Sequence, residues 1–128
     1  IIHSREAAAD TMYIMKNYAQ GLDGVIHCYS YSREMAEEYV KMGFYIGIGG
    51  VVTFKNAKKL KDVAAAIPIE KIVLETDCPY MAPEPYRGKR NQSSYIRYVA
   101  EKIAELKEMS QEEVIAVTEK NARDLYGI

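Results

Sequence analysis

The stretch Lys71-Ile72-Val73-Leu74-Glu75-Thr76-Asp77 places three consecutive branched apolar residues in front of two carboxylates. A short apolar run of this kind, a few residues after a proline, is typical of a buried strand. Because side chains alternate along a strand, Glu75 and Asp77 are expected to share one face. The sequence therefore predicts a buried strand from Lys71 to Asp77 that ends in a pair of carboxylates.

The same unit, an apolar run followed by a helical pattern, occurs four times along the chain. The other three runs are Ile1 to His3, Gly24 to Tyr29 and Phe44 to Gly50. This alternation is typical of an α/β fold in which helices pack outside a parallel sheet, so we expect four parallel strands in chain order. The glycines in the third run suit a strand that other backbone or a ligand approaches closely.

The helical patterns have recognisable ends. Ser32 is a plausible N-cap, Gly43 and Pro68 stop the second and third patterns, and Ser110 with Glu113 forms a capping box. Five helices are expected, over residues 8–19, 33–42, 57–67, 95–107 and 111–126. Between the fourth strand and the fourth helix, residues 78–94 form a long loop that holds three of the four prolines and a basic cluster.

Size and composition narrow the protein class. A chain of 128 residues fits one domain but is too short for a complete eight-stranded α/β barrel. A net charge of -1 gives no overall attraction to nucleic acid or membrane, and no apolar stretch is long enough to span a bilayer. Cys28 and Cys78 are too few for a disulfide framework, so we expect unbridged thiols in a cytoplasmic protein. Ile1 and Ile2 look like the inside of a strand, and we expect residues 1–128 to be a single partial domain of a truncated chain.

His3, His27 and Asp77 each lie at the carboxyl end of an expected strand. In a barrel-type sheet this end carries the active site, because the loops that leave the strands converge there. Imidazole and carboxylate are ligands for a divalent cation, and such a cation can generate hydroxide at neutral pH. A lone histidine is more often a structural group, but two at equivalent strand ends together with Asp77 favour a metal site. For Glu75, an ion pair with a buried lysine or arginine and a catalytic role both remain open.

The long loop has the composition of a phosphate-binding segment. Arg87, Lys89 and Arg90 surround Gly88 and are followed by Asn91. Guanidinium groups donate bidentate hydrogen bonds to phosphate oxygens, so a nucleic-acid backbone is a reasonable ligand. Basic loops are also commonly solvated surface without a ligand. Arg5, two residues after His3, and Lys55, after the third strand, are expected to add positive charge to the same rim.

Five ordered motifs resemble the C-terminal half of TatD-type metal-dependent deoxyribonucleases, and together they cover essentially the whole chain. They are Ile2-His3-Ser4-Arg5, His27-Cys28-Tyr29-Ser30, Gly47-Ile48-Gly49-Gly50, Leu74-Glu75-Thr76-Asp77-Cys78-Pro79-Tyr80 and Arg87-Gly88-Lys89-Arg90-Asn91. The resemblance implies the C-terminal half of a TIM (β/α)8 barrel, strands five to eight, with two divalent metal ions and exonuclease cleavage of DNA phosphodiester bonds. It implies that His3 and His27 bind metal, and that Asp77 binds metal and orients or deprotonates the attacking water.

Nothing in the chain matches the family's His-x-His motif of the first strand or the bridging glutamate of the fourth. The resemblance therefore implies an incomplete metal site, and we expect weak or no activity from the chain alone. The expected partners are DNA and the missing N-terminal half-barrel. We also expect self-association through open sheet edges. Two alternatives stay open: a metal-dependent amidohydrolase acting on C–N or ester bonds, and a non-catalytic half-barrel. The basic loop from Arg87 to Asn91 argues against the first.

Overall fold

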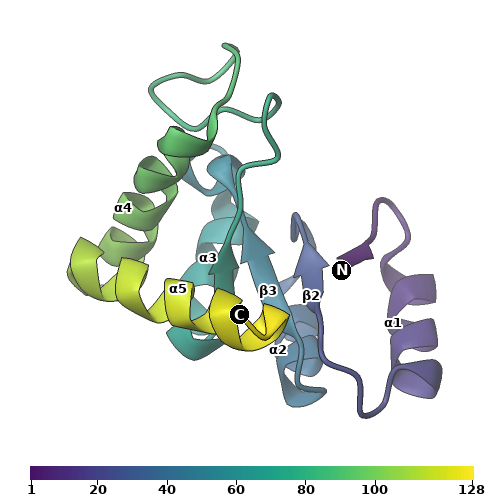
Figure 1. Cartoon of the computed structure of the whole chain (residues 1–128). Coiled ribbons are helices and arrows are strands. Elements are labelled where there is room, and N and C mark those ends of the chain that lie inside the picture. The colour runs from purple at the N-terminus through teal and green to yellow at the C-terminus, as the bar shows by residue number, and fades with distance from the viewer.

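A single parallel sheet organises the molecule. The computed structural model describes residues 1–128, and its four strands follow one another in the order β1-β2-β3-β4 (Figure 1). All three strand pairings are parallel. The strands are β1 (Ile2–His3), β2 (Val25–His27), β3 (Tyr45–Ile48) and β4 (Ile72–Leu74). The prediction of four parallel strands in chain order is confirmed.

At least one helix follows each strand, as expected. Ser32 caps its helix by accepting a hydrogen bond from the Met35 N–H at 3.3 Å, and Ser110 and Glu113 form the expected capping box. The helices are α1 (Ala8–Tyr18), α2 (Arg33–Lys41), α3 (Lys58–Ala66), α4 (Ile96–Lys107) and α5 (Gln111–Tyr126), with short 3-10 turns η1 (Gly50–Thr53), η2 (Ile69–Lys71) and η3 (Ser93–Tyr95). No helix combines the length and the apolar character that crossing a membrane requires.

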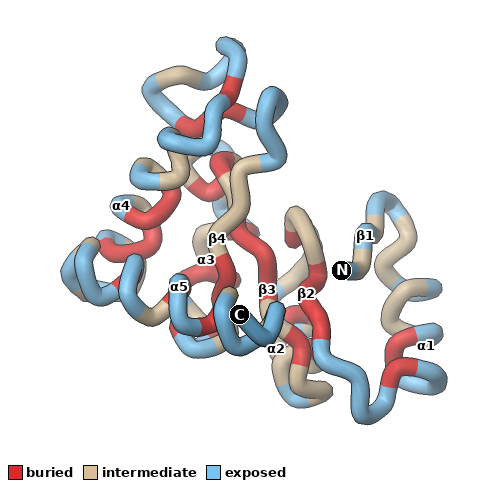
Figure 2. The backbone as a smooth tube through the Cα atoms, in the orientation of Figure 1, coloured by how far each residue is buried: buried red, intermediate tan, exposed pale blue.

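The core forms where helices pack on the sheet. One row of isoleucines, Ile2, Ile26, Ile46 and Ile72, runs across the four strands in register. The last three are buried, in one cluster with helix residues such as Tyr39 and Ile103 (Figure 2). Burying each such side chain contributes about 1.5–3 kcal/mol, so this row fixes how the strands lie against the helices.

A buried asparagine ties the last helix to the start of β4. The side-chain amide of Asn121, in α5, donates hydrogen bonds to the carbonyl oxygens of Ile69 and Ile72, each at 2.7 Å. The residue is only 4% exposed. It thereby satisfies two backbone carbonyls that no strand reaches, and it positions the strand that leads to Glu75 and Asp77.

The strands are shorter than the sequence suggested, because the chain turns soon after each one. Cys28 and Asp77 both have left-handed backbone, with φ of 50° and 53°. The residues after Gly49 wind into η1 instead of extending β3. Side chains therefore stop alternating before Asp77. The prediction that strand alternation places Asp77 on the same face as Glu75 is wrong, because β4 ends at Leu74. The contacts described below nevertheless bring both carboxylates to one histidine.

Candidate metal centre

His27, the last residue of β2, lies between two carboxylates from the segment after β4. Its Nδ1 is 2.8 Å from Oε2 of Glu75, and its Nε2 is 3.6 Å from Oδ1 of Asp77. The short contact fits the tautomer in which Nδ1 carries the proton and donates it to Glu75, and in that tautomer the lone pair of Nε2 faces Asp77. In metal sites, a carboxylate that accepts the N–H of the nitrogen not bound to metal commonly orients the histidine ring.

Glu75 is the supporting group, and sequence reasoning missed its partners. Neither a lysine nor an arginine pairs with it; instead Oε1 accepts the Cys28 N–H at 2.6 Å while Oε2 meets His27. Burial raises the pKa of the Glu75 carboxyl, and the hydrogen bonds from His27 and Cys28 oppose that rise. Gly47 makes room for it, since a Cβ there would come within 2.5 Å of Oε2. The expectation that glycines in this strand permit a close approach is confirmed, although the group nearest to Gly47 is the Glu75 side chain and not backbone or a ligand.

Asp77 supplies a second donor beside His27. Its side chain is 42% exposed, and the two atoms that face each other are 3.6 Å apart. Two ligands of one tetrahedral ion, each about 2.0–2.1 Å from it, are separated by roughly 3.4 Å. Nitrogen and oxygen donors at this spacing fit a divalent cation, and they account for two of the ligands that such a cation takes.

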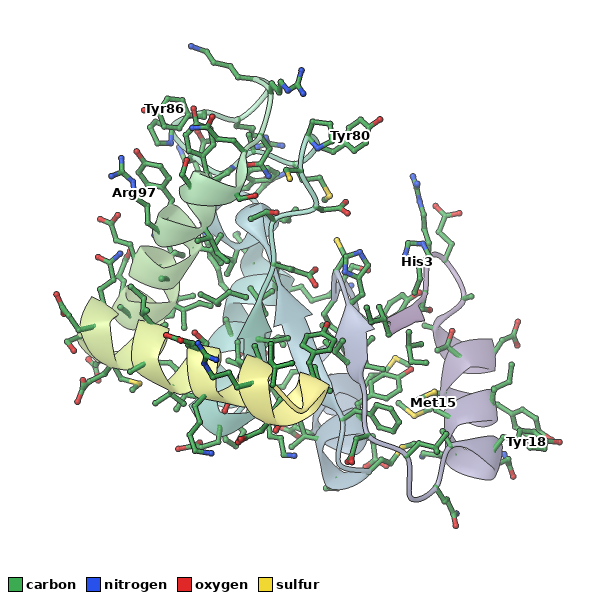
Figure 3. All side chains as sticks on the ribbon, in the orientation of Figure 1. His3, Met15, Tyr18, Tyr80, Tyr86 and Arg97 are labelled. Atoms are coloured by element: carbon green, nitrogen blue, oxygen red, sulfur yellow. The ribbon has the colours of Figure 1, made fainter.

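His3 and Arg5 lie at the rim of the same pocket, which has a volume of about 450 Å³ and also contains His27, Cys28 and Asp77. His3 is the register partner of His27, and their ring centres are 5.9 Å apart. Figure 3 shows His3 at the end of the short strand β1. The sequence placed His3, His27, Asp77 and Arg5 together, and the structure brings all four to one pocket.

The three candidate ligands do not converge into a complete site. Nowhere in the chain do three or more His, Cys, Asp or Glu side chains come close enough together to hold a metal ion. His27 and Asp77 form the closest pair, and His3 stands apart from them as the second imidazole. As a candidate metal centre the arrangement is therefore incomplete, and further ligands would be needed to fill a coordination shell.

The segment that carries His3 is held by a tyrosine that the sequence did not single out for this purpose. The Tyr31 hydroxyl lies 2.7 Å from the Ser4 hydroxyl and accepts the Ala7 N–H at 3.2 Å. Ser4 Oγ also lies 2.7 Å from Thr11 Oγ1. Tyr31 thus links the loop after β1 to the loop after β2, which fixes the backbone next to His3.

Because Cys28 follows His27 by one residue, strand alternation predicts that its side chain points away from the barrel interior, but Cys28 lies in the pocket. Its left-handed backbone turns its N–H toward Glu75, and its Sγ lies 3.9 Å from the sulfur of Met81. Burial, together with the charges of Glu75 and Asp77, raises the pKa of the Cys28 thiol to about 11. The thiol therefore stays protonated at neutral pH and is a poor ligand. Cys28 and Cys78 are both free, which confirms that they are unbridged.

The basic loop stands apart from the histidines. None of Arg87, Lys89, Arg90 or Lys55 lines either of the two pockets that contain Asp77. The guanidinium of Arg87 stacks 3.9 Å above the ring of Phe54. The loop rises beyond the strand ends, where Tyr80 and Tyr86 are labelled in Figure 3.

Asn91 makes structural hydrogen bonds within the loop and not the expected phosphate contact. Its side chain is buried, its Nδ2 donates to the carbonyl oxygens of Thr76 and Tyr80, and its Oδ1 accepts the Gln92 N–H. Both N–H donors are used, so none is left for a phosphate. Asn91 instead closes the loop against the segment that carries Asp77. Composition alone could not separate this buried amide from its exposed basic neighbours.

A sequence model described as "TatD related DNase" matches residues 1–127. The chain belongs to this family. Among curated TatD-like relatives it is 51% identical to the uncharacterized metal-dependent hydrolase YabD of Bacillus subtilis and 43% identical to YcfH of Escherichia coli, which bears the same description. Both alignments cover all of this chain but 51% and 49% of the relatives, so the chain spans about half their length.

Solved structures of TatD homologues have the same fold. The crystal structure of YjjV, a TatD homologue from Escherichia coli, superimposes with a TM-score of 0.91 at 30% identity, covering 98% of this chain and 49% of that one. A TatD family hydrolase from Entamoeba histolytica gives a TM-score of 0.83 at 24% identity, covering 96% of this chain and 48% of that one. The second likeness concerns the fold alone.

Proposed function

We propose that this chain is the C-terminal half of a TIM-barrel, divalent-metal-dependent hydrolase that cleaves DNA phosphodiester bonds as an exonuclease. The observation that carries the proposal is the environment of His27, which Glu75 holds on one side while Nε2 faces Asp77 on the other. This arrangement at the carboxyl ends of parallel strands is suited to metal-assisted hydrolysis. The names of YabD and YcfH as metal-dependent hydrolases support it.

The residues of the chain take separate roles in this proposal. His3, His27 and Asp77 are the metal ligands, and Glu75 keeps the His27 ring in one orientation and tautomer. A bound divalent cation supplies Lewis-acid activation of water and neutralises charge on the phosphate. Asp77, partly exposed beside His27, can in addition accept a proton from the attacking water.

DNA is the proposed substrate because positive charges lie at the rim of the site and on the loop beyond it. Arg5 lines the pocket that contains His3 and Asp77, and Arg87, Lys89 and Arg90 are exposed on the loop after β4. None of these four side chains makes a salt bridge, so their charges are available to phosphates. The family description as a DNase agrees with this choice.

The test is a DNA degradation assay with manganese or magnesium. The chain alone is expected to show weak or no cleavage, because its residues supply ligands for one loosely held cation. Mixing it with the N-terminal half of a TatD-related barrel should produce metal-dependent cleavage. That activity should fall at least about a hundredfold with Asp77→Asn or His27→Ala.

Two outcomes would contradict the proposal. Robust cleavage by the chain alone that is lost in His27→Ala would show that the count of required ligands is wrong. Recombined halves that hydrolyse cyclic amides or carboxylic esters and leave DNA intact would instead identify an amidohydrolase.

A further inference from the structure

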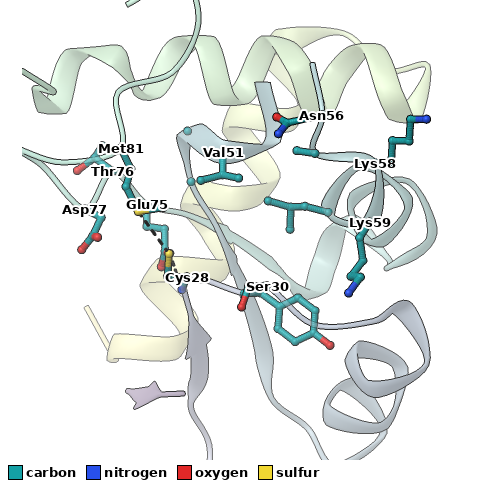
Figure 4. Close-up of a pocket in the computed structure, with 15 residues that line it drawn as sticks. Cys28, Ser30, Val51, Asn56, Lys58, Lys59, Glu75, Thr76, Asp77 and Met81 are labelled. Carbon is teal, nitrogen blue, oxygen red and sulfur yellow. Dashed lines mark hydrogen bonds between the residues drawn. The ribbon is translucent and has the colours of Figure 1, made fainter. Parts of the chain in front are cut away.

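A second pocket lies beside the candidate metal centre and shares Glu75 and Asp77 with it (Figure 4). Its volume is about 290 Å³, at the lower end of the range for small-ligand pockets. The loops that follow β2, β3 and β4 line it, together with the first turn of α3. We propose that this pocket binds one nucleotide unit of the DNA strand, the unit next to the bond that is cleaved.

The walls of the pocket suit the apolar part of a nucleotide. Val51, Ala57, Leu60 and Met81 contribute apolar side chains. Gly49 and Gly50 let neighbouring backbone come close, because a Cβ would lie 3.3 Å from the Glu75 carbonyl oxygen at Gly49 and would collide with the Met81 carbonyl oxygen at Gly50. A base or deoxyribose that covers these walls removes apolar surface from water, which stabilises binding by about 25 cal/mol per Å².

The charges in the pocket run from negative to positive along its length. Glu75 and Asp77 lie at one end, and Lys58 and Lys59 stand at the other (Figure 4). Both lysines are exposed, and neither makes a salt bridge or a hydrogen bond to a carboxylate. No side chain caps α3 at Ala57, so the first backbone amides of the helix add positive potential beside the two lysines.

This polarity matches one repeat of a nucleic-acid strand. In a strand, the sugar and base of a nucleotide, which carry its apolar surface, lie between two phosphates, and the pocket has apolar walls between a candidate cation site and a pair of lysines. With the reacting phosphate at Asp77, the next phosphate lies toward Lys58 and Lys59. The inference rests on the proposed function for the identity of the reacting group, but binding in the pocket requires no cleavage.

The experiment measures binding in a chelator, where no hydrolysis can occur. The full chain, labelled with nitrogen-15, is titrated in EDTA with deoxyadenosine 5′-monophosphate, deoxyadenosine or inorganic phosphate. The monophosphate should shift the amide signals of residues 49–51 and 58–60 and bind at least about tenfold more tightly than either fragment. Lys58→Ala with Lys59→Ala should weaken its binding about tenfold, the loss of one or two charge-assisted hydrogen bonds.

Matched variants separate the two parts of the pocket. Lys61→Ala removes a lysine of the same helix outside the pocket and should leave binding unchanged. Val51→Ala should weaken deoxyadenosine and leave phosphate unaffected. Equal affinities for inorganic phosphate and the monophosphate, no shifts at residues 49–51, or equal binding by the double variant and Lys61→Ala would each overturn the proposal. If the chain binds the nucleotide but the recombined halves do not cleave DNA, the pocket proposal stands and the proposed function is contradicted. If the recombined halves cleave DNA but the chain does not bind the nucleotide, the proposed function stands and the pocket proposal is contradicted.

Discussion

At the scale of single residues, the orientation of His27 depends on Glu75, which is 48 positions away in the sequence. Glutamate can accept from the His27 ring and the Cys28 N–H at once because it has two equivalent oxygens. A glutamine of the same shape has one acceptor oxygen and one amide, so it can satisfy only one of these donors. The position of the proton on His27 then becomes free to change.

We therefore predict that Glu75→Gln weakens binding of zinc to the recombined halves about 10- to 100-fold. The free energy of unfolding should change by less than about 1 kcal/mol, because the lost hydrogen bond is offset by removal of a buried charge. Isothermal titration calorimetry and urea unfolding measure the two quantities. Glu84→Gln, an exposed glutamate in the same loop, is the matched control. Unchanged zinc affinity in Glu75→Gln would mean that the contact does not orient His27.

Sequence reasoning predicted the location of the candidate residues better than their contacts. His3, His27 and Asp77 could be placed at one end of the sheet because each follows an apolar run that ends at the same edge of a parallel sheet. The bond between Glu75 and His27 could not, since it joins strands that are not neighbours and depends on the space left by Gly47. Asn91 was misplaced because burial is set by the fold of the whole loop, and no local pattern reveals it.

At the scale of elements, the helices were more predictable than the strands. Caps such as Ser110 with Glu113 act within one turn, so the sequence nearby contains the whole signal. Strand ends depend on distant partners. β4 begins only at Ile72 because residues Ile69–Lys71 form a 3-10 turn. Asn121 of α5 holds this junction by donating hydrogen bonds to the carbonyl oxygen of Ile69 in the turn and to that of Ile72 at the start of β4.

We predict that Asn121→Asp lowers the free energy of unfolding by about 2–4 kcal/mol. The substitution keeps the shape but replaces two donated hydrogen bonds with a carboxylate that faces two carbonyl oxygens in a buried place. Urea unfolding followed by circular dichroism measures the change. Asn17→Asp is the control, since Asn17 donates a similar bond to the Tyr13 carbonyl on the exposed side of α1 and should alter stability by less than about 0.5 kcal/mol. Similar losses in both variants would show that the buried contact adds nothing.

At the scale of the whole molecule, the sheet has two free edges. β1 and β4 each pair on one side only, and α1 exposes Tyr13, Ile14 and Tyr18 to solvent. Free edges and exposed apolar groups favour association. The sheet has four strands, and the chain spans about half the length of the relatives that it matches.

We predict that the chain alone self-associates with rising concentration, and that the N-terminal half of a TatD-related barrel replaces this association with a one-to-one complex. Sedimentation velocity distinguishes the two. Replacing Tyr13 and Tyr18 with lysine should reduce self-association, whereas Tyr126→Lys, an exposed tyrosine on α5, should not. A chain that remains monomeric at high concentration, or that ignores the added half, would contradict the proposed pairing.

Gly47 shows how a residue without any functional group can belong to a candidate metal centre. Even an alanine at this position would press against Glu75 Oε2 and approach the Ile26 carbonyl oxygen to 3.2 Å, so the carboxylate would have to leave the place from which it holds His27. In a library of all single substitutions scored for activity, Gly47 would then rank with the histidines, although its loss removes no ligand and no charge. An engineer who transplants this centre to another scaffold must therefore copy the empty space at residue 47 as faithfully as the side chains.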